Sequence, residues 1–326
     1  MRQISITAIE EASQTVYEAA VRTPLVRLEL PFASVGAAPA ETYLKLESLQ
    51  PIGSFKIRGA WNAVRALSRD QLQGGVWTVS AGNAAQGVAF AARRAGAPCS
   101  VMVMETAPQT KIDSIERLGA RIIRVTYDEA WKTVEQHQSD RMEGTFVHPF
   151  DDDLFIAGNG TAGLEILEDL PDVDTVIAPL GGGGLLAGIG AVMRAKKPGV
   201  RVYAAEPATA APLATSLVRG EASYFEGWQA SFVDGAGGKS VLPGMWPLLR
   251  DLVDGSIVVS LDEVARAMKR TADRIHIIAE GAAGCAVAAA LSGRAGGGKI
   301  VAVVSGGNID LARFASLVGA CPDKLF

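Results

Sequence analysis

The chain has 326 residues, of which 48% are hydrophobic and 20% charged, and it contains 36 glycines. This composition excludes disorder and collagen-like repeats, and at roughly 150 residues per domain the length predicts about two domains. The 31 Lys and Arg against 35 Asp and Glu give a net charge of −4, without the basic excess typical of proteins that bind nucleic acid or anionic membranes. We therefore expect a protein that acts on a small molecule.

The cysteines and the apolar segments indicate a compartment. Cys99, Cys285 and Cys321 lie far apart, without a CxxC pair that would suggest a zinc or redox site. The first 20 residues lack an apolar signal core, and no stretch approaches the ~18 to 20 apolar residues of a membrane span. The sequence thus predicts a cytoplasmic protein.

Short apolar runs alternate with helix-like segments along most of the chain. The strand-like runs lie at 76–80, 99–104, 121–126, 175–180, 201–206 and 299–305. Continuous apolar runs are typical of buried parallel strands, so we predict an α/β fold with two mostly parallel sheets covered by helices. Residues 76–147 carry their own set of these units, which predicts a smaller domain there and a larger one built from 1–75 and 148–326. The loop-like stretch 234–247 is expected at the surface or over a site.

The segment GSFKIRGA (53–60) places Lys56 among apolar residues and glycines just before a helical run. A buried lysine has a lowered pKa, and its neutral amine can form a Schiff base with a carbonyl compound. The alternative is a surface lysine that begins a helix. For a lone lysine this alternative is the commoner case, so its neighbours decide.

Four glycines (181–184) stand between an apolar run and a helical run. Successive backbone amides at a helix N-terminus favour a phosphate. One alternative is a flexible turn. Another is a dinucleotide site, because Gly182, Gly184 and Ala187 fit GxGxxA and Glu206 follows about 20 residues later.

Two further polar loops each follow a predicted strand. SAGN (80–83) offers donors for a carboxylate at the start of an alanine-rich helix, although Ser80 or Asn83 would serve equally as a helix cap. SGGN (305–308) places Ser305 where its hydroxyl could hold a heteroatom of an aromatic ring. Alone, this second loop would be an ordinary turn.

These four motifs, in this order, resemble the serine/threonine dehydratase and serine racemase family of pyridoxal phosphate (PLP) enzymes, which have the tryptophan-synthase-like fold (fold type II). The resemblance extends to RTPL (22–25), VHPFDD (147–152), IAGNGT (156–161), AAEP (204–207), DLVDG (251–255) and EGAAG (280–284). A dinucleotide site would explain neither the lysine motif nor the two serine-asparagine loops.

The resemblance implies roles for individual residues. Lys56 would carry PLP as a Schiff base, Phe55 would pack against its ring, and Asn83 would bond its phenolic oxygen. The glycines would hold the phosphate, and Ser305 would meet the pyridine nitrogen. The full set of implied cofactor contacts is Phe55, Lys56, Asn83, Gly181, Gly182, Gly183, Gly184, Leu185, Glu280 and Ser305. The implied substrate loop is Ser80, Ala81, Asn83, Ala84 and Gln86, with Lys56 and Ser80 as the catalytic residues.

The implied reaction is β-elimination from a β-hydroxy-L-amino acid such as threonine or serine, which yields a 2-oxo acid and ammonia. A neutral serine at the ring nitrogen, rather than a carboxylate, makes a weaker electron sink and favours rapid loss of a β-leaving group. Lys56 would move the α-proton as a neutral amine. The smaller domain would be mobile and would close over the substrate, because it carries the SAGN loop.

The chain departs from the family pattern at three positions. Ala81 replaces the second serine typical of racemases, so racemisation is not expected. Ala84 replaces the usual histidine, which leaves room for a bulky substrate such as 3-phenylserine. Glu206 is followed six residues later by Pro212 instead of aspartate, so we predict no essential metal.

Alternatives remain within and outside this reaction. A racemase and a β-replacement synthase share the fold, and a non-catalytic PLP-binding protein is the alternative of another class. A homodimer would be common for the family, although one sequence defines no interface. His137, His148 and His276 share no metal-ligand spacing and no catalytic role is predicted for them, but His148 lies next to the predicted site loop.

Overall fold

The computed structural model describes residues 2–29 and 40–321, and within them six strands form one sheet in the order β1-β2-β10-β7-β8-β9. All neighbours are parallel except β1, which is antiparallel to β2. The strands are β1 (Leu25–Arg27), β2 (Glu41–Lys45), β7 (Thr175–Pro179), β8 (Arg201–Pro207), β9 (Gly255–Val259) and β10 (Lys299–Val303).

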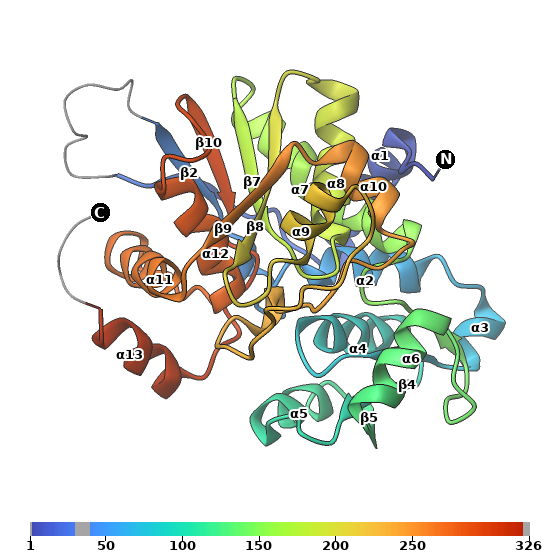
Figure 1. Cartoon of the computed structure of the whole chain (residues 1–326). Coiled ribbons are helices and arrows are strands. Elements are labelled where there is room, and N and C mark those ends of the chain that lie inside the picture. Colours follow the sequence, from blue (N-terminus) through green and yellow to red (C-terminus); the bar gives the residue numbers. More distant parts are fainter. Residues whose placement is uncertain (1, 30–39, 322–326) are drawn as a thin grey trace.

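Helices cover both faces of this sheet, which Figure 1 shows between two helical layers. One layer holds α1 (Ile6–Thr15), α7 (Asp153–Asp169), α8 (Gly184–Lys196) and α10 (Trp246–Leu252), and the other α11 (Leu261–Ile275), α12 (Gly281–Leu291) and α13 (Leu311–Gly319). In β7, Val176 enters the core on the α8 side and Ile177 the core on the α12 side. Because both faces are buried, the strand is apolar throughout.

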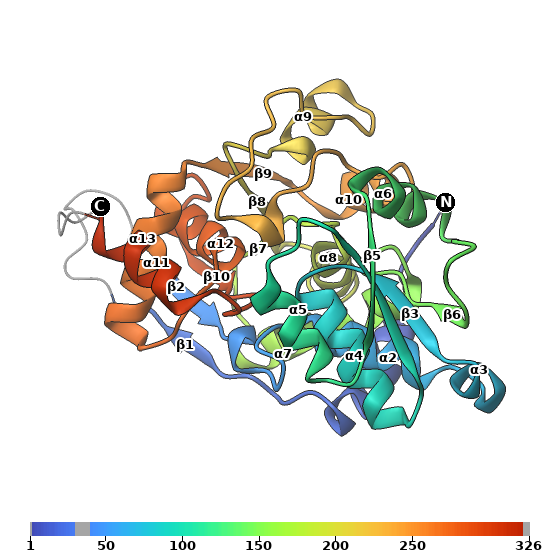
Figure 2. The ribbon, with the colours of Figure 1, turned by 90° about the horizontal axis from the view of Figure 1, so that it is seen from below.

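A second sheet has the order β5-β4-β3-β6 and is entirely parallel. Its strands are β3 (Val76–Val79), β4 (Cys99–Met104), β5 (Arg121–Val125) and β6 (Thr145–Phe146). Its helices are α4 (Asn83–Ala95), α5 (Gln109–Glu116) and α6 (Tyr127–Gln136), with α3 (Arg69–Gln73) nearby (Figure 2). The prediction of an α/β fold with mostly parallel, helix-covered sheets is confirmed.

Helix α2 (Lys56–Arg65) packs against α4 and α7, so it touches both halves of the molecule. The contact with α7 needs glycine on both sides. A Cβ at Gly59 would lie 2.3 Å from the Phe155 ring, and one at Gly158 would lie 2.4 Å from the carbonyl oxygen of Arg58. The first residue of α2 is therefore held in a closely packed frame.

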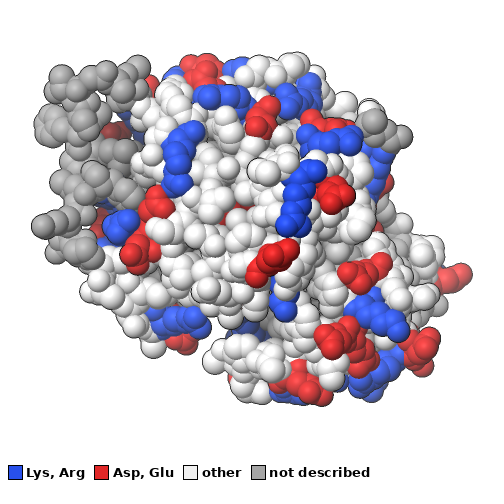
Figure 3. Space-filling model, viewed as in Figure 1, with Lys and Arg blue, Asp and Glu red and all other residues white. Residues whose placement is uncertain are grey.

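The remaining elements are short and lie in connections. They are α9 (Pro212–Arg219), which packs on β8 and β9, and the 3₁₀ turns η1 (Val16–Glu18), η2 (Glu47–Leu49) and η3 (Asp234–Ala236). None of the described helices is long and apolar enough to cross a membrane. On the face shown in Figure 3, positive and negative side chains are interspersed.

Candidate active site

The loops that carry three of the sequence motifs meet next to α2. Ser54 forms an antiparallel bridge with Gly306, and the Phe55 N–H donates to the Ser305 carbonyl at 3.0 Å. The Asn308 side chain donates to Asn83 Oδ1 at 2.7 Å. The lysine motif, SAGN and SGGN therefore form one site, although about 250 residues separate the first from the last.

The glycine loop joins this site through the turn that precedes α7. Lys56 Nζ donates to the Pro149 carbonyl at 2.6 Å. The next residue, Phe150, packs on the glycines so closely that a Cβ at Gly182 would lie 2.0 Å from its ring. Gly183 has φ +92°, a left-handed conformation that suits glycine, and it caps the N-terminus of α8. Leu185, in the first turn of α8, is buried.

Lys56 is the first residue of α2 and has an apolar surrounding. Its Nζ lies 5.2 Å from the centre of the Phe55 ring and 5.3 Å from that of Phe155. Burial lowers the pKa of Lys56 to about 7. A large fraction of this amine is therefore neutral and nucleophilic near neutral pH, as the sequence predicted for a lysine in this context.

Asn83 has both ends of its side-chain amide fixed. Its Nδ2 donates to Glu280 Oε1 at 2.8 Å, and its Oδ1 accepts from Asn308, which also donates to the Ile52 carbonyl at 2.8 Å. Burial, with a contribution from Asp234, raises the pKa of Glu280 to about 7. One N–H of Asn83 stays available for a ligand.

The substrate loop predicted from the sequence lies at the N-terminus of α4. Ser80 Oγ accepts from the Gly82 N–H at 3.1 Å, while Ala81 and Gln86 are partly exposed and Ala84 is buried. A Cβ at Gly87 would lie 3.1 Å from the Lys56 carbonyl, so this helix end and that of α2 are neighbours. Amides at such an end are suited to a carboxylate.

Ser305 and the loop 234–247 complete the surroundings. Ser305 is buried at the end of β10. A Cβ at Gly181 would lie 2.7 Å from the Gly235 carbonyl oxygen. Part of the loop 234–247 thus lies over the glycines. The sequence predicted this loop at the surface or over a site.

Glu206 does not belong to this site. Its two oxygens accept the N–H groups of Leu213 and Ala214, each at 2.8 Å, and Ser256 also donates to it. The carboxylate therefore caps α9. Both oxygens are occupied by protein donors, which leaves a poor cation ligand.

Sequence analysis missed Phe155, whose ring lies against Lys56, and two further contributors to the site, Pro149 and Asn308. Pro149 acts through its backbone, which no residue type reveals, and Asn308 was passed over in favour of the serine of the same loop. The signal for both was membership of the quoted motifs VHPFDD and SGGN.

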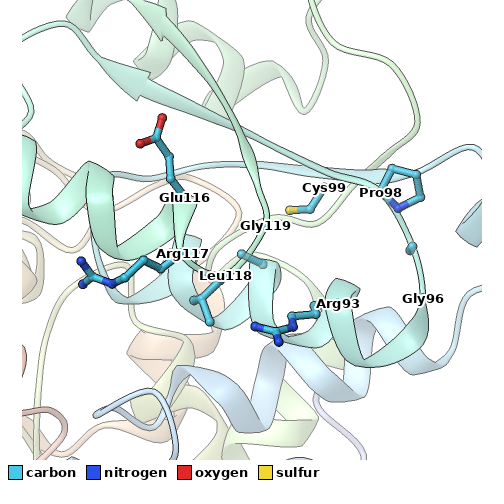
Figure 4. Close-up of a pocket in the computed structure, with 10 residues that line it drawn as sticks. Arg93, Gly96, Pro98, Cys99, Glu116, Arg117, Leu118 and Gly119 are labelled. Carbon is cyan, nitrogen blue, oxygen red and sulfur yellow. The ribbon is translucent and has the colours of Figure 1, made fainter.

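Two cavities differ in their relation to this site. The larger, about 450 Å³, lies between the ends of α4 and α5, beside Arg93 and Arg117 (Figure 4), and none of the predicted site residues lines it. A smaller one, about 70 Å³, adjoins Gly181 and Gly182. Its mostly apolar wall consists of Trp131, Phe150, Leu180, Gly238, Ser240, Val241, Leu242 and Leu249.

Comparisons with known proteins agree with this geometry. The family model "Pyridoxal-phosphate dependent enzyme" matches residues 16–306. The L-threonine ammonia-lyase of Thermotoga maritima is 39% identical over 311 residues, which cover 94% of this chain and 76% of the relative. Maize serine racemase is 31% identical, with 97% of each chain covered and a TM-score of 0.84. Threonine deaminase isoform 2 of Solanum lycopersicum, in its processed form, is 30% identical, with 98% of this chain and 95% of that chain covered and a TM-score of 0.82.

The chain belongs to the family of pyridoxal-phosphate dependent enzymes, with the architecture called fold type II. The groups in the site fit this cofactor. A neutral lysine amine can bind an aldehyde, the glycine loop adds no side chains of its own beside its backbone amides, and a buried hydroxyl and a fixed amide are hydrogen-bonding partners for a ring.

Proposed function

We propose that this enzyme is an ammonia-lyase that converts a β-hydroxy-L-amino acid to a 2-oxo acid and ammonia by β-elimination. The carrying observation is Lys56, a lysine of lowered pKa at the start of the helix beside which the SAGN and SGGN loops meet. Relatives named L-threonine ammonia-lyase and threonine deaminase support the same reaction.

Bound pyridoxal phosphate supplies a sink for the negative charge that develops at the substrate α-carbon. The chain would hold the cofactor through Lys56, the amides of residues 181–185, Asn83 and Ser305, with Phe55 against its ring and Glu280 behind Asn83. A hydroxyl at Ser305 leaves this sink weaker than a carboxylate would, which favours early loss of the β-substituent.

The substrate carboxylate would bind at the N-terminus of α4, to Ser80, Asn83, the Ala84 N–H and Gln86. It would then lie beside the start of α2, whose first residue is Lys56. Neutral Lys56 takes the α-proton, and its ammonium can return a proton to the departing hydroxyl. Ala81 has no proton to exchange on the opposite face, so a racemase is the weaker candidate in spite of the likeness to maize serine racemase.

The side chain of the substrate would be bulkier than that of threonine. Ala84 leaves the carboxylate loop without an imidazole, and the cavity beside the glycine loop has an apolar wall that includes Trp131 and Phe150. A phenyl group such as that of 3-phenylserine suits these surroundings better than the methyl group of threonine.

The test is to purify the yellow holoenzyme and compare 2-oxo acid release from L-threonine, L-serine and L-threo-3-phenylserine. Release that Lys56→Ala abolishes supports the lyase. Release only after added sulfide, or conversion of L-serine to D-serine without 2-oxo acid, would replace it by the synthase or the racemase. Bound PLP with no reaction in any assay would favour the non-catalytic alternative.

Substrate size is tested on the same protein. With Trp131→Ala, kcat/KM for 3-phenylserine should fall about 10-fold while that for serine changes little, because an apolar contact worth about 1–2 kcal/mol is lost. A wild-type enzyme that does not prefer 3-phenylserine to threonine contradicts the aromatic pocket but leaves the lyase intact.

Location and assembly belong to the same proposal. We expect a cytoplasmic enzyme, since all three cysteines are free, which suits a reducing compartment. A homodimer is expected from the family, and size-exclusion chromatography with light scattering decides it.

A further inference from the structure

His148 is a buried histidine in the connection from β6 to α7, with both ring nitrogens in use. Nδ1 accepts the N–H groups of Phe150 at 3.2 Å and Asp151 at 2.7 Å. Nε2 lies 3.2 Å from the carbonyl oxygen of Val134 in α6. Because backbone N–H groups only donate and carbonyl oxygens only accept, Nδ1 carries no proton and Nε2 carries one. The ring is therefore neutral and in a single tautomer.

The groups around the ring keep it neutral. Burial is the main cause that lowers the pKa of His148, to about 4, and His137 and Lys56 act in the same direction. Asp151 and the Val134 carbonyl oppose this shift without cancelling it. The imidazole thus keeps its hydrogen-bond pattern over the pH range in which Lys56 titrates.

The turn that His148 folds carries two parts of the site. Pro149, within this turn, presents the carbonyl that accepts Lys56 Nζ at 2.6 Å. Phe150 stands edge-on to the imidazole, 4.6 Å between ring centres, and lies against Gly182. The His148 ring thereby connects three parts of the structure: helix α6, the Pro149 carbonyl that accepts Lys56, and the Phe150 ring that lies against the glycine loop.

A metal site is the competing interpretation of this cluster. His137, His148 and Asp151 bring ligand atoms within 4.8 Å of one another. Both His148 nitrogens are engaged by the backbone, however, and Asp151 pairs with Arg2. An ion would have to break these bonds, so the geometry favours a structural role for the ring.

We propose that His148 is a positioning residue for Lys56, which it aligns through the Pro149 carbonyl while it holds Phe150 on the glycine loop. The proposal rests on the function proposed above for Lys56. It assigns His148 no contact with substrate or cofactor. Its claim is that loss of the ring moves the lysine and admits water to it.

Three substitutions of His148 distinguish the hydrogen bonds at Nδ1 from the one at Nε2. His148→Asn places an amide oxygen near Nδ1 and keeps the acceptor for the two N–H groups. His148→Gln places an amide nitrogen near Nε2 and keeps only the donor to Val134. His148→Leu removes both. The matched control is His276→Asn, since His276 is an exposed histidine in the left-handed region at the end of α11, where Asn is tolerated.

Holoenzymes of these variants are compared in kcat, KM, pH profile and visible circular dichroism of the bound cofactor. We expect His148→Leu to lower kcat about 100-fold with KM changed less than about 3-fold, because a misplacement near 1 Å costs that much. The lysine limb of the pH profile should move upward as water reaches the amine, and the dichroism should change. His148→Asn should keep all three close to wild type, and His148→Gln should resemble Leu.

A role in stability alone would lower the unfolding midpoint without moving the pH limb or the dichroism, and that result overturns the proposal. If His148→Leu does not fold, the pair Asn and Gln decides: equal behaviour of the two also overturns it. Nitrogen-15 NMR of the labelled wild-type holoenzyme must show a protonated Nε2 and a bare Nδ1 down to about pH 5; the opposite tautomer contradicts the geometry.

Failure of this proposal and failure of the proposed function are distinguishable. If no amino acid yields a 2-oxo acid but His148→Leu still changes the dichroism and Asn restores it, the reaction is wrong and the positioning role stands. If the wild type turns over and all His148 variants match it in kcat, pH limb and dichroism, the positioning role is wrong and the reaction stands.

Discussion

Lys56 combines two properties that seldom coincide in one lysine. Its amine is enclosed by the rings of Phe55 and Phe155, yet it keeps a single strong acceptor in the Pro149 carbonyl. A carboxylate in that place would hold the amine as an ammonium, whereas an uncharged carbonyl orients it without favouring the charged form as strongly. The site therefore orients the Lys56 amine without favouring its protonated form.

This ionisation predicts a pH dependence. Burial depresses the pKa of Lys56 to about 7, so the neutral form needed to take the α-proton is populated above that pH and lost below it. We expect kcat with a saturating amino acid to rise with pH through a limb near 7 and then level off. A limb that appears only near the ordinary lysine pKa would contradict this role for Lys56, after a control that the enzyme stays folded across the range.

A second prediction concerns Asn308, whose amide fixes that of Asn83. Asn308→Ala removes two hydrogen bonds, one of which fixes Asn83, and loss of that one at about 1 kcal/mol should weaken PLP binding roughly 5-fold. Dialysis followed by titration of the visible absorbance measures it. The matched control is Asn62→Ala, which loses a 2.7 Å bond to the Leu154 carbonyl away from the site and should bind PLP like the wild type.

The site residues that the sequence predicted are those whose side-chain type and immediate neighbours already indicate a chemical role. A lysine among glycines and apolar residues, and asparagine in SAGN, indicated a site before any fold was known. Pro149 and the neutral tautomer of His148 could not be predicted, because the first acts through a backbone carbonyl and the second depends on a contact with α6, 14 residues away in sequence.

Helix α2 owes its position to a buried group of charges behind Lys56. Arg58 donates to both oxygens of Glu47, at 2.7 and 2.8 Å, and to both oxygens of Glu165, at 2.7 and 2.9 Å. Lys45 adds a bond to Glu165 at 2.6 Å. All four side chains are buried, with two positive and two negative charges. Burial acts to lower the pKa of Arg58, but the two carboxylates outweigh it and raise that pKa.

Arg58→Met should lower the stability of the protein strongly, because it leaves Glu47 and Glu165 buried without their forked partner. The expected cost is about 3–5 kcal/mol, read as a lowered midpoint in urea or heat. Arg65→Met in the same helix removes an exposed pair with Glu18 and should cost at most about 1 kcal/mol. Equal effects of the two substitutions would mean that the buried group does not hold α2.

The hydrogen bonds of Glu206 at the start of α9 lead to a prediction about metal ions. Two amides at the start of that helix and Ser256 already satisfy the carboxylate, which needs no cation. Exhaustive treatment with a chelator should therefore change neither kcat nor the unfolding temperature. Ser256→Ala should lower that temperature slightly through one lost bond. Inactivation by the chelator, reversed by Mg²⁺ or Ca²⁺, would show that the protein donors do not replace an ion.

At the scale of elements, the sequence predicted the six strands that read as short apolar runs, the partly exposed edge strand β5 among them, and missed β1, β2, β6 and β9. The six apolar runs became β3, β4, β5, β7, β8 and β10. The strand β2 reads ETYLK, with two apolar residues in five. Strand β6 has two residues, and β9 begins at Gly255, the last residue of the quoted motif DLVDG (251–255). Their pairing comes from neighbouring strands, so the local pattern could not reveal it.

Across the whole molecule, the two sheets are joined by contacts of different strength. One cluster of buried residues contains Trp77 and Met102 from the second sheet together with Val176 and Val301 from the first. Contacts nearer the surface join the helices of the second sheet to the loop 234–247. Lys111 of α5 pairs with Asp234, and Lys239 Nζ lies 4.3 Å from the centre of the Tyr127 ring in α6. The predicted mobility of residues 76–147 would thus consist of breaking the exposed contacts while the shared core bends.

The double variant Lys111→Gln, Lys239→Gln tests this motion. Both lysines reach between the second sheet's helices and the loop region that covers the glycines, and each exposed contact is worth about 0.2–1 kcal/mol. Their loss should favour an open form and raise KM for the amino acid about 3- to 10-fold, with the unfolding midpoint nearly unchanged. Lys132→Gln on the exposed face of α6 is the control for charge. An unchanged KM in the double variant would mean that the closed state does not depend on these two contacts.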